Sequence, residues 1–406
     1  MTDNFKKNVI WNTVGVSAFS LTSLIYTIIL MRYSTLEITG IFTIGFALAC
    51  TTTSLAALGG RTYQVTDVKN ELSPFTYILS RYITVFIVIL LVFVYIMCRN
   101  YSINKFLIVF ILCIFKYLEE ISDVYYGIMQ KEDKLYYVGQ FQLLKSLCNV
   151  LSFFLVIKIK DDLLLAVLSI ALINLLFILF LERPLAKKIK KWDYSVTKNQ
   201  ILKYFKVNST ICIFTFLTIY LANAPKYTID LYLNDEVQAV FGIIIMPATV
   251  MLLVCNFIIN PVLIKIANLY NDNKISEIVS IFKKIILLIS CIGILGLFVC
   301  YFIGIPFLNF VYSSNFENYK LELMVIIVGS IFYSISMICS SFLTSIRKIK
   351  IQLYINIIFG IFALFISTFL VKAFNVFGGA LSYLIIMFVR MIVYLFLTFK
   401  NCKIKE

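Results

Sequence analysis

The 406-residue sequence contains no histidine, so it has no side chain that titrates near neutral pH and no imidazole metal ligand. Many catalytic and redox sites are thereby excluded. The ten cysteines lie mostly within apolar runs, without a C-x-x-C pair or a metal-binding spacing. Such buried cysteines usually act as small apolar side chains. We therefore expect no metal site and no cofactor.

Charged residues are also scarce, at 14% of the chain, whereas 61% of residues are hydrophobic. Soluble domains carry about 25% charged residues. The sequence therefore predicts an integral membrane protein with many spans. Backbone groups in lipid must be satisfied within each segment, so these spans are expected to be helices and the fold all-α. The net charge of +15 does not indicate nucleic-acid binding, because no soluble domain exists to carry such a surface.

A membrane-spanning helix needs about 20 mostly apolar residues. Twelve segments of the chain meet this requirement and are predicted to span the bilayer. They are residues 10–31, 38–60, 76–98, 104–126, 137–158, 163–182, 208–231, 237–260, 284–307, 322–345, 350–371 and 377–399.

The basic residues between the predicted spans are unevenly distributed. Alternate segments, starting from the N-terminus, hold 24 lysines and arginines, and the other set holds 7. Basic residues are retained on the cytoplasmic side of membranes. The sequence therefore predicts a multi-pass protein with both termini in the cytoplasm.

The longest loop lies near the middle of the chain and divides the spans six and six. We expect an N-terminal six-helix bundle (1–182), a cytoplasmic linker (183–206) and a C-terminal six-helix bundle (207–406). A weak repeat supports this division: with an offset of 199 residues, MRYSTLEITGIF (31–42) and DLYLNDEVQAVF (230–241) share Tyr, Glu and Phe. Such repeats are common in transporters, with the substrate bound in a central cavity between the bundles.

Polar residues inside the seventh span share one helix face. Asn223, Lys226, Tyr227 and Asp230 are spaced i, i+3, i+4 and i+7 in LANAPKYTID. Pro225 removes a backbone hydrogen bond and is expected to bend this helix. A charge in the bilayer core usually faces a bundle interior or a water-filled cavity. The alternative is a kinked helix in which Lys226 and Asp230 neutralise each other.

The fourth and fifth spans carry similar polar faces. Lys116, Glu119 or Glu120, and Asp123 follow helical spacing in KYLEEISD. For Asp123, the alternative is the end of an amphipathic helix emerging into water. The fifth span places Gln142, Lys145, Asn149 and Ser152 on one face.

Two further bases lie within predicted spans. Arg81 is close enough to the cytoplasmic end of the third span to reach the surface, whereas Arg390 in the last span is deeper. A cavity lined by these bases suits an anionic, hydroxyl-rich ligand, because Lys and Arg pair with phosphate and polar side chains hydrogen-bond to sugars.

Several segments together give the chain a family resemblance. They are GGRTYQVTDVKNEL after the second span, SDVYYGIMQKEDKLYYVGQFQLLKS across the fourth and fifth, and NAPKYTIDLYL in the seventh. With them, the chain resembles the Wzx-type flippases of polysaccharide repeat units. These flippases belong to a superfamily that also includes multidrug and toxin extruders and lipid II flippases.

The resemblance implies two six-helix bundles that work by alternating access. It implies a lipid-linked oligosaccharide as cargo, most often on undecaprenyl diphosphate, in the cytoplasmic membrane of a bacterium. The expected partners are then the bilayer, this cargo, and the polymerase and glycosyltransferases of the pathway.

The matching positions are Asn223, Pro225, Lys226 and Tyr227 in the seventh span, Arg61, Gln64 and Asp67 after the second, and Asp123, Gly127, Gln130 and Lys145 in the fourth and fifth. Lys145 stands where the family commonly has arginine. That change keeps the charge but loses the bidentate fork of a guanidinium.

The expected site therefore has three groups of residues. The substrate-binding candidates are Lys226, Asn223, Tyr227, Lys145, Lys116, Arg390, Arg81 and Arg61. The candidates for ion coupling are Glu119, Glu120, Asp123 and Asp230, and the candidate hinges are Pro225 and Pro247.

Two other functions remain open. A multidrug extruder on the same scaffold should favour acids over bases in its cavity, if its cargo is cationic. A membrane enzyme such as a polysaccharide polymerase or ligase usually carries a sizeable outer loop, and the longest predicted outer connection here is only Leu308 to Leu321. The sequence therefore favours a transporter over an enzyme, and the choice of proton or sodium coupling stays open.

Overall fold

The computed structural model describes residues 3–67, 71–272 and 274–403. It forms two compact units, residues 1–216 and 217–406, and the division falls inside one long helix. Ten helical stretches among the described residues are long and apolar enough to cross a membrane. The prediction of an all-α, multi-pass membrane protein is confirmed.

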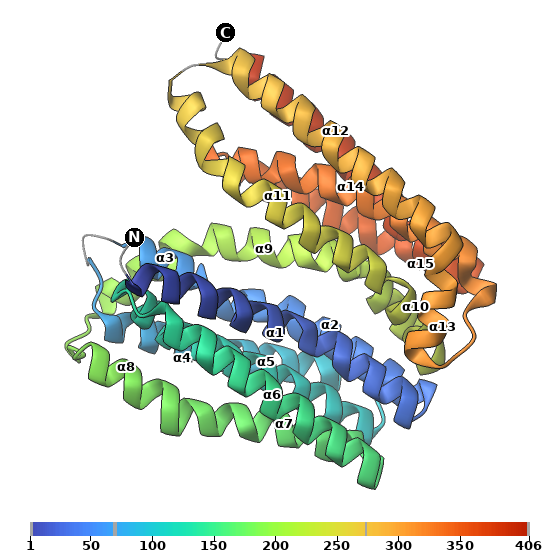
Figure 1. Cartoon of the computed structure of the whole chain (residues 1–406), viewed down its shortest axis with the longest axis horizontal. Coiled ribbons are helices and arrows are strands. Elements are labelled where there is room, and N and C mark those ends of the chain that lie inside the picture. The colour runs from blue at the N-terminus through green and yellow to red at the C-terminus, as the bar shows by residue number, and fades with distance from the viewer. Residues whose placement is uncertain (1–2, 68–70, 273, 404–406) are drawn as a thin grey trace. The chain divides into compact units, whose positions relative to one another are not determined.

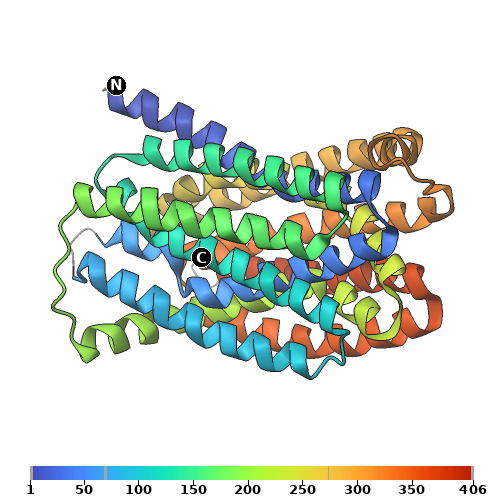
Figure 2. The ribbon, with the colours of Figure 1, turned by 90° about the horizontal axis from the view of Figure 1, so that it is seen from below.

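The N-terminal unit contains nine helical segments and the first part of a tenth. They are α1 (Asp3–Tyr33), α2 (Leu36–Ala57), α3 (Gly60–Thr66), α4 (Pro74–Met97), α5 (Ile103–Lys131), α6 (Leu135–Lys160), α7 (Leu163–Phe177), the π-helical segment η1 (Ile178–Glu182), α8 (Arg183–Ile189) and the start of α9 (Lys198–Tyr232). Its long helices run alongside one another (Figure 1 and Figure 2).

Helix α5 lies at the centre of this unit and packs against α2, α3, α4, α6, α7 and α8. It coincides with the predicted fourth span, yet it is not among the ten apolar stretches. The reason is its charge, since Lys116, Glu119, Glu120 and Asp123 fall within two turns. A helix with this much charge remains at membrane depth only if its neighbours supply partners.

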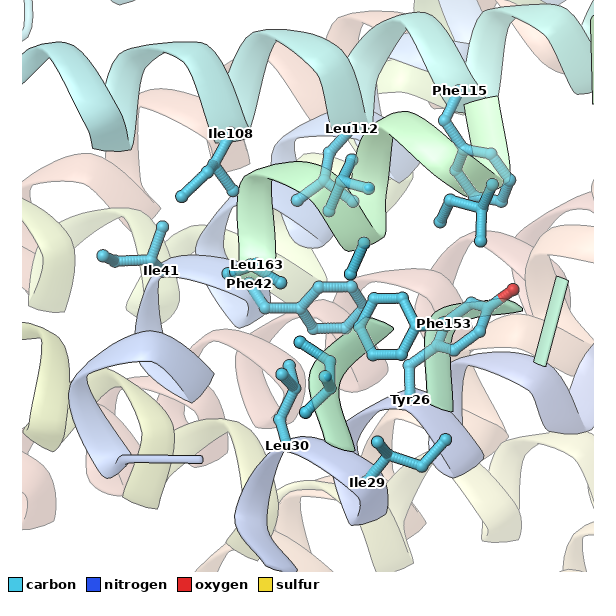
Figure 3. Close-up of a cluster of buried hydrophobic side chains, with 14 of the residues drawn as sticks. Tyr26, Ile29, Leu30, Ile41, Phe42, Ile108, Leu112, Phe115, Phe153 and Leu163 are labelled. Carbon is cyan, nitrogen blue, oxygen red and sulfur yellow. The ribbon is translucent and has the colours of Figure 1, made fainter. Parts of the chain in front are cut away.

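The apolar core of the unit gathers side chains from α1, α2, α5, α6 and α7. The rings of Tyr26, Phe42 and Phe153 meet at its centre, with centroids 4.6 to 6.0 Å apart. Ile108 and Leu112 of α5 cover one side of the rings (Figure 3). Elsewhere α1 and α6 approach so closely that a Cβ at Gly15 would lie 2.2 Å from the carbonyl oxygen of Gly139. These contacts hold the helices around α5 in place.

The C-terminal unit contains the rest of α9 and the remaining segments. They are α10 (Asp235–Ile244), α11 (Met246–Asn271), α12 (Ile275–Val299), the π-helical segment η2 (Cys300–Gly304), α13 (Ile305–Tyr312), the short 3₁₀ turn η3 (Glu317–Tyr319), α14 (Lys320–Ser345) and α15 (Ile349–Lys403). Helix α14 is central here and packs against α10, α11, α12 and α15.

Two interruptions divide the helices of this unit. In α15, Asn375 adopts φ 50° and ψ −123°, a backbone conformation that breaks the helix between the predicted eleventh and twelfth spans. Between α10 and α11, the helix is interrupted at Ile245, and Pro247 is the second residue of α11. Proline fits the first turn of a helix because the missing N–H has no helical acceptor there.

The repeat seen in the sequence corresponds to one local structure. Thr35 caps α2 by accepting a hydrogen bond from the Ile38 amide at 3.3 Å, and Asn234 caps α10 in the same way from the Val237 amide at 2.9 Å. The two caps are related by the same 199-residue offset, and the matching Phe42 and Phe241 are both buried. The same helix-to-helix corner is therefore built in each unit.

The predicted linker is largely helical. Helix α8 covers its first residues and α9 begins at Lys198, so the non-helical part is residues 190–197. Hydropathy detects only the apolar part of a helix, and the polar first turns of α9 extend it beyond the predicted span 208–231.

Candidate functional site

Three acidic side chains of α5 each meet a basic side chain. Glu119 pairs with Lys116 one turn away on the same helix. Glu120 pairs with Arg81 of α4 at 2.8 Å, and Asp123 lies 3.6 Å from Arg61 of α3. Substrate-binding and ion-coupling candidates are thus brought together, and each candidate base in this group faces a candidate acid.

Arg81 is enclosed by the end of α2 and the middle of α5. Its side chain is 3% exposed, so it does not extend to the membrane surface. Besides Glu120, it donates to the carbonyl oxygen of Ala56 at 3.1 Å, and Thr84 donates to the same oxygen at 2.8 Å. That carbonyl belongs to the last turn of α2, where carbonyls lack helical partners and carry partial negative charge. Arg81 therefore ties α4 to both α2 and α5.

Lys116 sits in an aromatic environment. Its ammonium lies 5.3 Å from the ring centres of Phe19 and Phe46 and 5.8 Å from that of Phe115. Ring faces attract a cation, and the attraction strengthens when water is excluded. Lys116 is thus held by a carboxylate and three rings contributed by α1, α2 and α5.

Lys145 forms the most deeply buried ion pair of the unit. Its ammonium lies 2.9 Å from Oε1 of Glu182 and 3.0 Å from Oγ of Ser122. The Tyr126 hydroxyl donates to the same Glu182 oxygen at 2.6 Å. The exposed fractions are 3% for Lys145 and 0% for Glu182. Three elements meet here: α5, α6 and η1 at the end of the α7–η1 helix.

Glu182 is a residue that the sequence interpretation did not select. It is the last residue of the predicted sixth span and is followed by Arg183 and Pro184, so it resembles the start of a loop. The structure instead continues the helix through η1 into α8 and turns the carboxylate inward. The available signal was that Glu182 is the only acid in the span 163–182.

Helix α3, which follows α2, contacts α5 through Gln64. A Cβ at Gly127 would lie 2.2 Å from Oε1 of Gln64, so glycine allows the Gln64 amide to rest directly on α5. There Nε2 of Gln64 donates to the carbonyl oxygen of Val124 at 3.1 Å. Two residues that carry the family resemblance are therefore in direct contact.

Asp67 organises the loop between α3 and α4. Its carboxylate accepts bonds from the amides of Glu71 and Leu72 and from the Tyr77 hydroxyl. Partial burial alone would raise the pKa of Asp67, but these hydrogen bonds, led by the Glu71 amide and aided by the charge of Lys131, lower it below its ordinary value. Asp67 thus stays ionised and holds the backbone of Glu71 and Leu72.

The polar face predicted in the seventh span is present on α9. Asn223, Lys226, Tyr227 and Asp230 are partly exposed, and the intervening residues 224, 225, 228 and 229 are buried. The rings of Tyr220 and Tyr227 stack at 5.9 Å, which extends this face by one turn. Helix α9 continues through Pro225.

Arg390 lies on α15, inside the C-terminal unit. Its exposed fraction is 0%, and its guanidinium carbon is 5.3 Å from the ring centre of Tyr333 and 5.1 Å from that of Tyr394. Within the described residues, none of its three guanidinium nitrogens has a hydrogen-bond partner. The substrate-binding candidates therefore fall into two groups, one in each unit.

The ion-paired side chains of the N-terminal unit can exchange partners. Four bases (Arg61, Arg81, Lys116 and Lys145) are balanced by four acids (Glu119, Glu120, Asp123 and Glu182). An anion or a proton that enters this group can replace one partner and release the other. No trio of Cys, Asp or Glu suited to a metal occurs within the described part of the chain.

Known proteins resemble this chain over its whole length. No protein-family model matches it. A curated relative, the capsular polysaccharide biosynthesis protein CapF of Staphylococcus aureus, is 21% identical over 399 residues, which cover 97% of this chain and 98% of CapF.

Solved structures of transporters share the fold. A multidrug resistance MATE family transporter of the MOP superfamily, in its inward-facing conformation, matches with a TM-score of 0.72 at 12% identity, over 97% of this chain and 98% of that one. The Vibrio cholerae MATE transporter VcmN matches with 0.62 at 11% identity, over 99% and 97%. A MOP superfamily transporter from Pyrococcus furiosus matches with 0.55 at 13% identity, over 100% and 97%.

These similarities confirm the resemblance found in the sequence. The chain is a multi-pass membrane protein with the fold of the MOP superfamily transporters, and it is similar over its whole length to a protein of capsular polysaccharide biosynthesis.

Proposed function

We propose that this protein is a flippase that moves a lipid-linked oligosaccharide repeat unit, of the undecaprenyl diphosphate type, across the cytoplasmic membrane for cell-surface polysaccharide synthesis. The observation that carries the proposal is the group of ion-paired bases around α5, namely Arg61, Arg81, Lys116 and Lys145. These bases supply cationic partners for a diphosphate at the depth of the membrane.

The proposed architecture has twelve spans arranged as six and six around a central cavity. The helices that support it are α1, α2, α4, α5, α6 and α7–α8 in the first half, and α9, α10–α11, α12–α13, α14 and the two parts of α15 in the second. Residues 1–182 and 207–406 are the proposed bundles, joined by a cytoplasmic linker at 183–206. Both termini are proposed to be cytoplasmic, with Pro225 and Pro247 as hinges.

In the proposed mechanism, the ion pairs hold the basic side chains that later bind the cargo. In the absence of cargo, each of these four bases is neutralised by an acid of the N-terminal unit, so none of the four is left as an isolated charge. A diphosphate carries several negative oxygens and forms charge-assisted hydrogen bonds with Arg and Lys. It competes with Glu120 for Arg81 and with Asp123 for Arg61, and the displaced acids then take up protons or cations. Cargo binding is thereby coupled to ion binding.

The residues on α9 are proposed to contact the sugars and phosphate of the cargo. Tyr227 and Asn223 offer stacking and amide hydrogen bonds, and Lys226 offers a charge. Their partly exposed face is the one that a large polar headgroup can reach. Asp230 completes the set of ion-coupling candidates.

A cationic-drug extruder is the second candidate, favoured by the match to MATE folds. The ion-paired bases oppose it, because a cationic drug gains nothing from four additional positive charges near its path. A membrane enzyme is a weaker candidate, since the solved neighbours are transporters.

The test is transport by the purified full-length protein in sealed vesicles. Vesicles carrying a fluorescent undecaprenyl diphosphate oligosaccharide are probed with a membrane-impermeant reagent that quenches outer-leaflet label. We expect the wild-type protein to expose the inner-leaflet label, and Arg81→Met to do so much more slowly. Equal rates with and without protein would refute the proposal. Uptake of a cationic dye that depends on Glu119, Glu120 or Asp230 would favour the extruder instead.

In the cell, the proposed partners are the polymerase and glycosyltransferases that use and make the same repeat unit. Loss of the protein should leave lipid-linked repeat units on the cytoplasmic face of the membrane. Their normal arrival at the outer face in the deletion strain would contradict the proposal.

A further inference from the structure

Three connections between helices of the C-terminal unit meet around one hollow of about 470 Å³. They join α9 to α10, α13 to α14, and the two parts of α15. Helices α10 and α13 lie at the same end of this unit (Figure 1). In the topology proposed above, all three connections are on the outer side of the membrane. The hollow therefore opens to the side on which the cargo arrives.

Aromatic rings form part of the lining of this hollow. They come from Tyr319, Phe374 and Phe377. The rings of Phe374 and Phe377 lie nearly perpendicular, with centroids 6.4 Å apart, and Phe374 is 52% exposed. A partly exposed ring offers a flat apolar surface, against which the C–H face of a sugar can stack.

Three planar polar groups complete the lining, and they belong to Asn234, Glu322 and Asn375. The carbonyl oxygen of the Asn234 side chain already accepts from the Val237 amide, which leaves its NH₂ group to donate. A carboxylate accepts hydrogen bonds from hydroxyls, and an amide both donates and accepts them. Rings together with such groups match a ligand that has both an apolar face and many hydroxyls.

The charge of the hollow selects against an anion. Glu322 is the one charged side chain among its lining residues. The ammonium of Lys320 lies 3.9 Å from the ring centre of Tyr301, and that of Lys372 lies 4.1 Å from the ring centre of Tyr232. Both lysines are therefore directed to rings outside the lining. A carboxylate repels a phosphate or an acidic sugar, so the lining favours an uncharged sugar.

The turn inside α15 is strained where it meets the hollow. Asn375 has φ 50° and ψ −123°, which lies outside the left-handed helical region that asparagine tolerates. The turn is also tight, since a Cβ at Gly378 would lie 1.9 Å from the carbonyl oxygen of Leu370. A turn that only joined two helices would favour glycine at position 375. Such strained residues cluster at ligand sites, and this one places the Asn375 side chain in the lining.

We propose that this hollow binds uncharged sugar rings of the cargo's oligosaccharide on the outer side of the membrane. The inference rests on the proposed function, which supplies both the oligosaccharide and the side. The volume lies within the range of small-molecule sites, roughly 300–1,000 Å³, and suits a short segment of a glycan. Binding there retains the translocated headgroup on the outer side and opposes its return.

Binding of lipid-free sugar to the full-length protein in detergent tests the proposal. The probe is the oligosaccharide that mild acid releases from the lipid-linked repeat units of cells making this protein, and saturation-transfer difference NMR detects its contact with the protein. We expect saturable binding to the wild type. Glu322→Gln should bind about tenfold more weakly, as the loss of a charge-assisted hydrogen bond implies, and Tyr319→Ala should also bind more weakly.

The matched control is Tyr354→Ala, which removes a ring that is 67% exposed near the start of α15, outside the lining. It should bind as the wild type does. Absence of binding to the wild type, or equal binding by all variants, would overturn the proposal. The finished polysaccharide of the same cells carries the same sugars and is the second probe. Tighter binding of that polymer, per repeat unit, would contradict the assignment to the cargo.

A second measurement needs no variant and so does not depend on how the variants fold. The oligosaccharide should slow amide hydrogen exchange in the three connections, residues 233–237, 317–322 and 372–377, and leave the linker residues 190–197 unchanged. Protection confined to other segments would refute the site. Neither measurement involves transport. Flipping without binding of the free oligosaccharide would refute the hollow alone, whereas binding without flipping would refute the proposed function alone.

Discussion

Two buried arginines, Arg81 in the N-terminal unit and Arg390 in the C-terminal unit, have opposite surroundings. Arg81 meets a carboxylate at 2.8 Å and a helix-end carbonyl at 3.1 Å. Arg390 meets two tyrosine rings and, among the described residues, no carboxylate. The N-terminal unit thus pairs its buried arginine with a carboxylate, whereas Arg390 packs against rings and neutral groups among the described residues.

The comparison also separates two kinds of function. Internal ion pairs can exchange partners with an incoming ion or headgroup, so they suit a transport cycle. Arg390 packs against rings and has no paired carboxylate to exchange among the described residues. Variants that disturb each kind of charge should therefore have different effects.

The largest effect is expected at the Lys145–Glu182 pair. Lys145→Met leaves the fully buried Glu182 carboxylate without a counter-charge, and removing one partner of a buried pair costs about 3–5 kcal/mol. Thermal unfolding in detergent should show a strongly lowered midpoint. The double variant Lys145→Met with Glu182→Gln keeps an acceptor for Tyr126 and should recover most of the loss. A single variant as stable as the double would contradict the pairing.

The next effect concerns transport through the pairs on α5. Glu119→Gln with Glu120→Gln removes two carboxylates that hold Lys116 and Arg81. Charge-assisted hydrogen bonds contribute about 1.5–3 kcal/mol, so transport of the lipid-linked oligosaccharide should slow about 10- to 100-fold if these acids are used in coupling. The vesicle assay measures this rate. Full activity of the double variant would exclude coupling through α5.

A smaller loss is expected on α9. Lys226→Ala removes a charge from the partly exposed polar face and should slow transport about tenfold, equivalent to about 1.4 kcal/mol. Lys226→Arg keeps the charge and should retain most of the rate. Protein levels in the membrane are compared for both variants, so that transport is separated from expression. Equal loss in both would indicate a role for lysine that charge alone does not explain.

Arg390→Met should behave unlike any variant of an ion-paired base. The substitution removes a buried charge that no described carboxylate neutralises, so the free energy of unfolding should stay unchanged or rise by about 1 kcal/mol. Arg81→Met should lower it under the same conditions, because Glu120 is left unpaired. Unfolding midpoints of the two variants, measured side by side, test whether the two arginines truly differ. Equal destabilisation would show that Arg390 also has a partner within the protein.

The fold could be predicted from the sequence because lipid imposes strong rules on composition. A lysine or arginine within an apolar run is conspicuous, and so Lys116, Lys145, Arg81 and Arg390 could be selected. Their partners could not, since the Arg81–Glu120 pair joins residues from two helices that only packing brings together. Helical spacing shows which residues share a helix face, but it does not show which neighbouring helix packs against that face.

Glu182 shows where local reasoning fails. An acid next to Arg183 and Pro184 at the end of a hydrophobic run has the pattern of a loop, and the π-helical segment η1 that turns it inward has no signal in hydropathy. Likewise, the sequence could place Arg390 at depth, but only the structure shows that two tyrosine rings, and no described carboxylate, lie against it.

The smallest expected effect is at Asp67, outside the membrane-spanning helices, where the charge is again satisfied locally. Its pKa is lowered in the folded protein, so its ionised form stabilises the fold above the unfolded pKa of about 3.9, and this stability is lost as the pH falls through the lower folded value. Asp67→Asn should therefore flatten the pH dependence of the unfolding midpoint below about pH 5. Because the carboxyl is only partly buried, solvent screens the charge and the change should be small. Tyr77→Phe removes one of its hydrogen bonds and should give an intermediate slope, whereas a wild-type slope in both variants would place the acid sensitivity elsewhere, among the carboxylates of α5.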